Sequence, residues 1–289
     1  MFERMSPLVL GTMLLTESAA GVLDEYVRLG GTTLDTARVY EGGESERALG
    51  DWLARQPSSV RERLVIVSKG AHPDGDRRRV TPEEIERDLR TSVELLGGSV
   101  DVYLLHRDDP SVPVGTIVEA LNGLREAGLI RGFGTSNWTT ERIDEANAYA
   151  AAHGLEGFSI SSQHLSLATQ NEEHWPDTRS AGDRAIHDWH VRTQTPLLAW
   201  SSLARGYFAG RDDGDVARVY DSPANRERRR RARELGRRLG RSAAQVALAW
   251  VLHQPYPVYA AFGARTPQQV RERFGALEVD AAELASLTE

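Results

Sequence analysis

Three short stretches of this sequence determine its fold: TTLDTARVY (residues 32–40), LVIVSKG (64–70) and DVYLLHRDD (101–109). Each contains an apolar run typical of a β-strand, and each run stops at or just before an ionisable residue. These ionisable residues are Asp35, Tyr40, Lys69 and His106. In a barrel of alternating strands and helices, the carboxyl ends of the strands meet on one face, and that face carries the chemistry. The sequence therefore predicts that the four side chains gather at one mouth of a barrel.

The rest of the chain alternates strand and helix patterns in the same way. Strand patterns are expected over residues 8–12, 32–36, 64–69, 101–106, 131–137, 158–163, 196–202 and 257–263. Helices are expected between them, two of which begin with capping boxes, at Thr81 with Glu84 and at Ser242 with Gln245. Eight alternating units predict a (β/α)8 TIM barrel forming a single domain over residues 1–289. A doubly wound sheet is the competing fold, but no G-x-G-x-x-G follows an early strand.

Composition narrows the class of protein further. The 289 residues include 40% hydrophobic ones and no cysteine, which excludes disulfides, thiolate metal sites and a cysteine nucleophile. We see no signal peptide and no run of the roughly 20 apolar residues that a membrane span needs. We therefore expect a cytoplasmic protein without membrane contacts. The net charge of −7 argues against nucleic-acid binding, and we interpret the basic run at residues 226–233 as a solvated helix face.

An ordered set of motifs along the chain resembles the aldo-keto reductase family. The motifs are LGTM (10–13), LDTARVYEGGESE (34–46), VSKGAH (67–72), LLHRDDPSVPV (104–114), GFGTSNW (132–138), Gln163, AWSSLARG (199–206) and FGARTPQQVRE (262–272). The resemblance covers essentially the whole chain. It implies an NADPH-dependent enzyme that reduces a small-molecule carbonyl substrate, with the nicotinamide lying across the carboxyl ends of the strands.

The four ionisable residues suit this chemistry. Reduction of a carbonyl needs a hydride from a cofactor and a proton from a weak acid within hydrogen-bond reach. We predict that Tyr40 is the acid, that Lys69 lowers its pKa from about 10, and that Asp35 holds Lys69. His106 would orient the carbonyl by donating an N–H. Taken one at a time, each residue could instead be structural: a turn aspartate, a loop tyrosine, a rim lysine or a satisfied histidine. In the family, the matching residues form the catalytic tetrad.

The resemblance also implies a set of cofactor contacts. Ser136, Asn137 and Gln163 match residues that bind the nicotinamide carboxamide, and Trp200 matches an aromatic that stacks on the ring; a core tryptophan is the alternative. The remaining contacts would come from residues near the ribose and from the loop over the pyrophosphate, namely Gly11, Thr12, Met13, Ser201, Leu203 and Arg205.

The segment from Gly263 to Thr266 departs from the family pattern. Many members grip the 2′-phosphate of NADP with a Lys-Ser pair and a later arginine, whereas this chain has Gly263, Ala264 and Gln269. Arg265 is the remaining cation, and an arginine can bind phosphate bidentately. We predict NADP as cofactor, with Gln269 and Glu272 near the adenine.

Three functions fit these residues. The first is an NADPH-dependent aldehyde or ketone reductase. The second is a cofactor-binding regulatory protein like the potassium-channel β subunits, which resemble the family. The third is an NAD(P)-dependent dehydrogenase oxidising a sugar or alcohol. The sequence leaves the substrate, the reaction direction and the oligomeric state open. Mouth loops around residues 13–15, 107–108 and 165–179 and the stretch after Tyr207 are expected to select the substrate. They contain Met13, Trp138, His164 and Trp175.

Overall fold

The computed structural model describes residues 2–13 and 20–287 of the chain. Eight strands in this part close into a barrel in which each strand pairs in parallel with the next, and β8 pairs with β1. The predicted TIM barrel is therefore confirmed. The strands are β1 (Leu8–Gly11), β2 (Thr33–Asp35), β3 (Val65–Gly70), β4 (Val100–Leu105), β5 (Ile130–Ser136), β6 (Ser161–His164), β7 (Leu197–Trp200) and β8 (Val258–Phe262).

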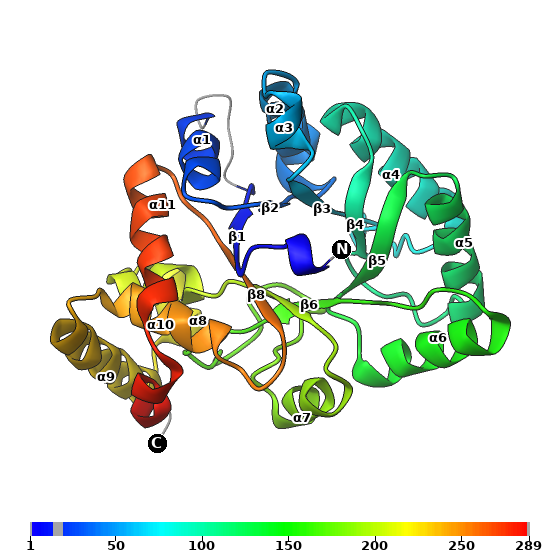
Figure 1. Ribbon diagram of the computed structural model, residues 1–289. Helices are drawn as coiled ribbons and strands as arrows, with labels where there is room; N and C mark the ends of the chain where they lie inside the picture. The colour runs from blue at the N-terminus through cyan, green and yellow to red at the C-terminus, as the bar shows by residue number, and fades with distance from the viewer. Residues whose placement is uncertain (1, 14–19, 288–289) are drawn as a thin grey trace.

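Helices surround the barrel, as Figure 1 shows. They are α1 (Ala20–Arg28), α2 (Glu44–Ala54), α3 (Ser58–Arg61), α4 (Pro82–Leu96), α5 (Val114–Glu126), α6 (Thr140–His153), α7 (Arg184–Thr193), α8 (Gly214–Tyr220), α9 (Pro223–Leu239), α10 (Ala243–Leu252) and α11 (Pro267–Phe274). Short 3-10 helices complete the described chain: η1 (Phe2–Arg4), η3 (Tyr40–Gly43), η4 (Ala204–Ala209), η5 (Gly275–Glu278), η6 (Ala281–Glu283) and η7 (Ala285–Leu287). Within the described ranges, no helix has the length and apolarity needed to span a bilayer.

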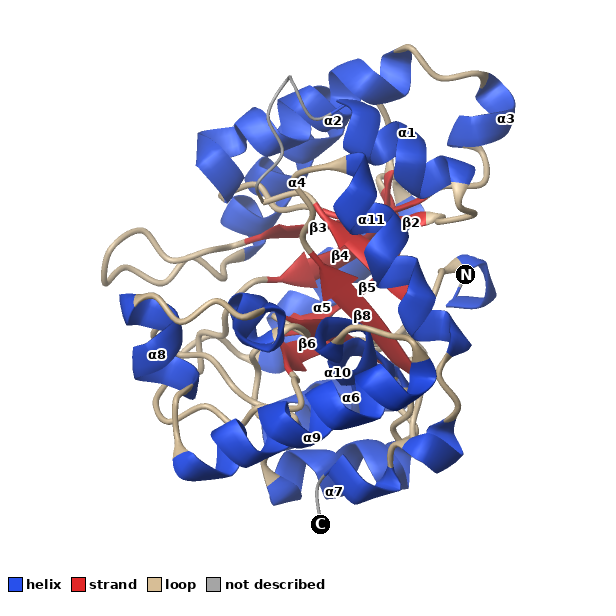
Figure 2. Ribbon diagram, turned by 90° about the vertical axis from the view of Figure 1, so that its left-hand side faces the viewer, coloured by secondary structure: helices blue, strands red, loops and turns tan. Residues whose placement is uncertain are grey.

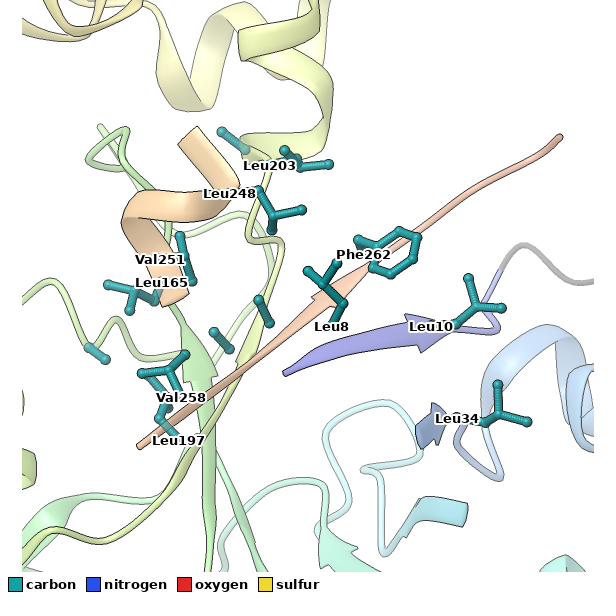
Figure 3. Close-up of a cluster of buried hydrophobic side chains, with 14 of the residues drawn as sticks. Leu8, Leu10, Leu34, Leu165, Leu197, Leu203, Leu248, Val251, Val258 and Phe262 are labelled. Atoms are coloured by element: carbon teal, nitrogen blue, oxygen red, sulfur yellow. The ribbon is translucent and has the colours of Figure 1, made fainter. Parts of the chain in front are cut away.

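Two apolar layers result from the period-two alternation of the strands. The inner layer fills the barrel with residues such as Val9, Val67 and Leu104, and Met5 of the N-terminal segment joins it. The outer layer lies between strands and helices; Figure 3 shows part of it, where Leu248 of α10 joins Leu197 and other strand residues. Figure 2 shows the N-terminus at one end of the barrel and α8 at the other.

The two predicted capping boxes have different outcomes. Ser242 and Gln245 form the complete capping box that the sequence predicts. At Thr81 only half of the predicted box exists: the Thr81 hydroxyl accepts from the Glu84 N–H at 3.4 Å. The Glu84 carboxylate instead pairs with Arg77 at 2.6 Å, Arg87 at 3.2 Å and Arg79 at 3.3 Å, because three arginines outcompete a single backbone N–H.

Two segments add detail to the sequence interpretation. The Gly/Asp-rich stretch before α9 contains helix α8, which buries Val216, Val219 and Tyr220 on one face at helical spacing. Within the predicted basic helix, Glu227 pairs with Arg230 and Arg231, so the arginine run lies on α9 among intrahelical ion pairs.

Candidate active site

Strand alternation brings three of the four predicted residues to the interior of one barrel mouth. Asp35 ends β2, Lys69 is the penultimate residue of β3, and His106 directly follows β4. Val67 and Leu104, each two residues earlier, belong to the inner layer, so Lys69 and His106 point to the same side. The three side chains are 6%, 3% and 9% exposed, respectively.

Tyr40 reaches the same place from the turn that follows β2. It opens η3, whose backbone turns sharply through positive φ values of 48° at Glu41, 66° at Gly42 and 106° at Gly43. The two glycines tolerate this conformation, and Glu41 adopts it at a cost. The Tyr40 side chain remains half-buried, so that its hydroxyl lies against Lys69 while the residue keeps access to solvent.

Lys69 links the cluster. Its Nζ donates to Asp35 Oδ1 at 2.6 Å, to the Thr36 carbonyl at 2.9 Å and to the Tyr40 hydroxyl at 3.2 Å. All three ammonium hydrogens therefore have acceptors. Burial alone would lower the pKa of Lys69, but the Asp35 carboxylate and Tyr40 raise it above its ordinary value. The ammonium is consequently charged and fixed beside the phenol.

The net pKa of Tyr40 differs from the sequence prediction. Burial raises the pKa of the phenol above 10, and Lys69 offsets only part of this effect. The predicted lowering of the pKa by Lys69 is present, but the desolvation of the hydroxyl, which depends on the folded surroundings, outweighs it. A protonated phenol remains a proton donor, and Lys69 still favours the phenolate that donation would leave.

His106 is a neutral imidazole in this setting. Burial, followed by the charges of Lys69, His72 and Arg107, holds its pKa well below 6.5. Its ring lies edge-on to Tyr40, with 6.1 Å between centroids, and Nδ1 is buried without a partner in the described chain. A neutral ring offers one N–H, so His106 can donate to a carbonyl oxygen without adding charge.

The structure adds three neighbours, of which the sequence analysis had assigned only Arg107, as part of a mouth loop. His72, two residues after β3, packs edge-on against His106 with 4.8 Å between centroids. Arg107 is only 7% exposed and donates from Nη1 to the His106 carbonyl. Behind Lys69, the buried Glu46 accepts from Ser68 at 2.6 Å. The positions of His72 and Arg107 after strand ends were visible in the sequence, whereas Glu46 lies in α2, and the burial and contacts of all three were not visible.

A second group of predicted residues lies on strands β5 to β7. Asn137 follows β5 with φ of 63°, and its Nδ2 donates to Ser136 Oγ at 2.9 Å. Its Oδ1 accepts from Trp200 Nε1 at 3.3 Å. The indole is only partly exposed and lies 5.6 Å from Trp175, centroid to centroid. Ser136, Asn137 and Trp200 are thus brought together.

Gln163 lies on β6 beside this group, pairing in register with Ala199, the residue before Trp200. It is fully buried, and its Nε2 donates to the Trp138 carbonyl at 3.1 Å, while Oε1 has no partner among the described residues. Trp138 is also fully buried, against Phe158. We expected Trp138 to lie in the mouth loops that select the substrate, but its complete burial shows that it does not face the mouth. Leu14 and Leu15 of those loops lie outside the described residues, and Met13 is 40% exposed.

His164 sits beneath Trp200 instead of at the mouth. It is 1% exposed, and its ring centroid is 5.1 Å from that of Trp200. Nδ1 pairs with Ser180 Oγ at 3.1 Å and Nε2 with the Tyr220 hydroxyl at 3.2 Å. Burial lowers the pKa of His164 to about 3. The ring is therefore neutral and supports the indole from below.

The loop after β7 has an unusual backbone. Ser201, Ala204, Arg205 and Gly206 all have positive φ, at 51°, 47°, 54° and 96°. Non-glycine residues in this region cost energy, and such conformations gather at ligand-binding loops. Turns of this kind direct backbone N–H groups into anion-binding concavities. The buried Leu203 anchors the loop. The predicted pyrophosphate position is compatible with this backbone.

The loop between β8 and α11 presents Arg265. Gly263 and Arg265 are exposed, and Arg265 forms no ion pair within the described chain. Gln269 accepts the Arg265 N–H at 2.7 Å. Glu272 accepts from Ser242 Oγ at 3.0 Å and pairs with Arg273, so it already joins α10 to α11. No such link was expected for Glu272.

These features fit a nicotinamide dinucleotide. Thr12 Oγ1 and Gln163 Oε1 are buried polar atoms without partners in the described chain, and Gly11 ends β1, directly before Thr12 in the sequence. Ser136, Asn137 and Trp200 form one polar group at the ends of β5 and β7, and the positive-φ loop of residues 201–206 follows β7. Arg265, which forms no ion pair among the described residues, lies just before α11. An amide-bearing ring, a pyrophosphate and a phosphate would each meet complementary groups. No cluster of metal-ligating residues occurs among the described residues.

The fold is a closed (β/α)8 barrel, and one mouth of it holds the Asp35–Lys69–Tyr40 cluster. The Aldo/keto reductase family model matches residues 7–289. Norsolorinic acid reductase stcV of Emericella nidulans is 28% identical, covering 96% of this chain and 75% of that protein. Aldo-keto reductase YhdN of Bacillus subtilis is 27% identical, covering 88% and 76%. The solved structure of the thermostable aldo-keto reductase Tm1743 with the inhibitor epalrestat covers 98% of this chain and 94% of its own, with a TM-score of 0.78 and 24% identity. The chain belongs to the aldo/keto reductase family.

Proposed function

We propose that this protein reduces an aldehyde or ketone to an alcohol, with NADPH as reductant and Tyr40 as proton donor. One observation carries the proposal: a single buried ammonium, Lys69 Nζ, lies 2.6 Å from the Asp35 carboxylate and 3.2 Å from the Tyr40 hydroxyl. A structural ion pair needs no half-exposed phenol beside it, whereas proton donation to a substrate does.

Each of the four residues has a distinct task in this scheme. The Tyr40 hydroxyl donates its proton to the carbonyl oxygen as negative charge develops there. Lys69 stabilises the phenolate that remains, and Asp35 keeps the ammonium charged and in place. Neutral His106 donates a hydrogen bond to the same oxygen and so fixes the plane of the carbonyl. The bound cofactor supplies the hydride to the carbonyl carbon.

The proposal extends to the residues that would hold the cofactor. Ser136 and Asn137 would bind the carboxamide, and Trp200 would stack on the ring with His164 packed beneath it. Gly11, Thr12 and Met13 would lie near the ribose, and the loop of Ser201, Leu203 and Arg205 would cover the pyrophosphate. Gln163 would take part only if its buried Oε1 becomes accessible to the carboxamide.

The preference for NADP over NAD depends on Arg265. This arginine is exposed at the start of α11 and forms no ion pair in the described chain, so its guanidinium is available for a 2′-phosphate. Gln269 already holds the Arg265 N–H, which orders the loop. Gln269 and Glu272 are proposed to border the adenine.

Two experiments test this proposal. Titration of the protein with NADPH and with NADH, followed by quenching of tryptophan fluorescence, should show much tighter binding of NADPH. Consumption of NADPH in the presence of a panel of aromatic and aliphatic aldehydes should then be measured by its ultraviolet absorbance. Binding without turnover of any carbonyl or alcohol would favour a regulatory protein, and turnover restricted to alcohols with NADP+ would favour a dehydrogenase. Absence of binding to either nucleotide would contradict all three functions.

A further inference from the structure

Arg107 is a buried charge without a counter-ion. It is 7% exposed, and no carboxylate within the described chain lies within ion-pair distance of it. Asp177, an acid of the adjacent loop, pairs with Arg78 at 3.2 Å instead. Burial lowers the pKa of the Arg107 guanidinium, and the more distant charges of Asp177 and Glu173 offset only part of this. A charge held in this way is costly unless a ligand pairs with it.

The guanidinium also has unused donors. Nη1 donates to the His106 carbonyl at 2.8 Å, and Nε donates to the Pro176 carbonyl at 3.3 Å. Arginine has five N–H donors, so about three remain without an acceptor among the described residues, including both on Nη2. Nη2 is not among the fully buried unpartnered atoms of the described chain.

Arg107 lies on the substrate side of the mouth. It directly follows His106, and its charge acts on three groups of the site: Tyr40, His72 and His106. The proposed phosphate contacts belong to the opposite part of the barrel, after β7 and β8. An anion drawn to Arg107 would therefore belong to the substrate and not to the nucleotide.

We infer that Arg107 binds a carboxylate on the substrate, so that the enzyme prefers carbonyl compounds bearing an acidic group close to the reacting carbon. The inference rests on the proposed reductase function and narrows its substrate class. The carbonyl oxygen would lie between Tyr40 and His106, and the carboxylate would accept from Nη2 of Arg107. The two polar ends of the substrate would thus be fixed by neighbouring groups.

Arg107 has one competing role, which is to fasten the mouth loop through its bond to the Pro176 carbonyl. That role predicts that replacing Arg107 weakens the turnover of neutral and acidic substrates alike. Carboxylate binding predicts a selective loss. Arg78 provides a matched control, because it is an arginine of the same region that already pairs with Asp177 and contacts the Asp108 carbonyl.

The test compares 2-, 3- and 4-carboxybenzaldehyde with their methyl esters, using wild type, Arg107→Gln and Arg78→Gln. For at least one ring position, wild type should show kcat/KM about 10- to 100-fold higher for the acid than for the ester, as expected for a hydrogen bond to a charged group. Arg107→Gln should lose this ratio whatever its turnover of the esters, while Arg78→Gln should keep the ratio.

Binding of benzoate and of benzamide, followed by tryptophan fluorescence, gives a readout that does not need turnover. Arg107→Gln should weaken benzoate binding by about 10-fold or more and leave benzamide binding unchanged. Ester turnover without preference for any acid, or a preference that survives in Arg107→Gln, would overturn the inference and leave the reductase function intact. Failure to reduce any carbonyl would count against the proposed function. In that case, equal benzoate affinity of wild type and Arg107→Gln would also overturn the inference.

Discussion

Breaking the buried ion pair at the centre of the site should cost at least as much stability as removing both partners. In Lys69→Met, the Asp35 carboxylate stays buried at 6% exposure without the ammonium that lies 2.6 Å away. Loss of one partner of a buried pair costs about 3–5 kcal/mol of unfolding free energy. The unfolding entropy of a chain of this length is about 0.6 kcal/mol/K, so the melting temperature should fall by roughly 5–8 °C.

The double variant Asp35→Asn/Lys69→Met removes both charges while nearly preserving side-chain volume. It leaves the new amide at position 35 and the Thr36 carbonyl underpartnered, at about 1–3 kcal/mol, so it should be no less stable than Lys69→Met. Urea denaturation of wild type, both single variants and the double variant gives the coupling free energy. If the single effects added to within about 0.5 kcal/mol, the two groups would not interact in solution and the account of the site would be refuted.

Three further variants test the remaining parts of the account. Arg265→Gln should weaken NADPH binding about 10- to 100-fold and leave NADH binding unchanged, as measured by fluorescence titration; equal loss for both nucleotides would argue against a 2′-phosphate contact. Trp200→Ala should weaken binding of either nucleotide through loss of about 0.5–1.5 kcal/mol of stacking plus the buried area, and an unchanged affinity would place the ring elsewhere. In the folded protein, the pKa of His164 is lowered to about 3, so this side chain stays neutral at about pH 5. In the unfolded chain it takes up a proton below about pH 6.5, so the free energy of unfolding should fall as pH drops. The loss attributable to His164 is about 2 kcal/mol at about pH 5. In urea unfolding at neutral pH and at about pH 5, His164→Gln should show a smaller difference than wild type by that amount, and an identical difference would mean that His164 titrates normally.

The period-two pattern of the strands was sufficient to predict where Asp35, Lys69 and His106 lie. Side chains of alternate residues face the same layer, so a strand that ends on an interior residue delivers it to the mouth. The Ser242–Gln245 capping box was equally local, because both partners belong to one helical turn.

The features that sequence reasoning missed depend on contacts between distant segments. Burial of Tyr40, which sets the net direction of its pKa shift, requires the walls that the barrel builds around it. Gln163 of β6 donates a hydrogen bond to the Trp138 carbonyl, which lies just after the neighbouring strand β5, and no local sequence pattern predicts that hydrogen bond. Arg107 has no counter-ion in the described chain. Whether an acid reaches it depends on all the segments packed around it, and the nearby Asp177 pairs with Arg78 instead, so only the folded chain could show this.

The most direct test of the central claim is Tyr40→Phe. The substitution removes only a hydroxyl that contacts Lys69 at 3.2 Å, so the site should otherwise keep its shape. If Tyr40 is the proton donor, kcat for carbonyl reduction falls by about 10²- to 10⁴-fold, as expected for loss of a general acid, while the affinity for NADPH stays nearly unchanged. Near-full activity of Tyr40→Phe would contradict the account, because the proton would then come from another group.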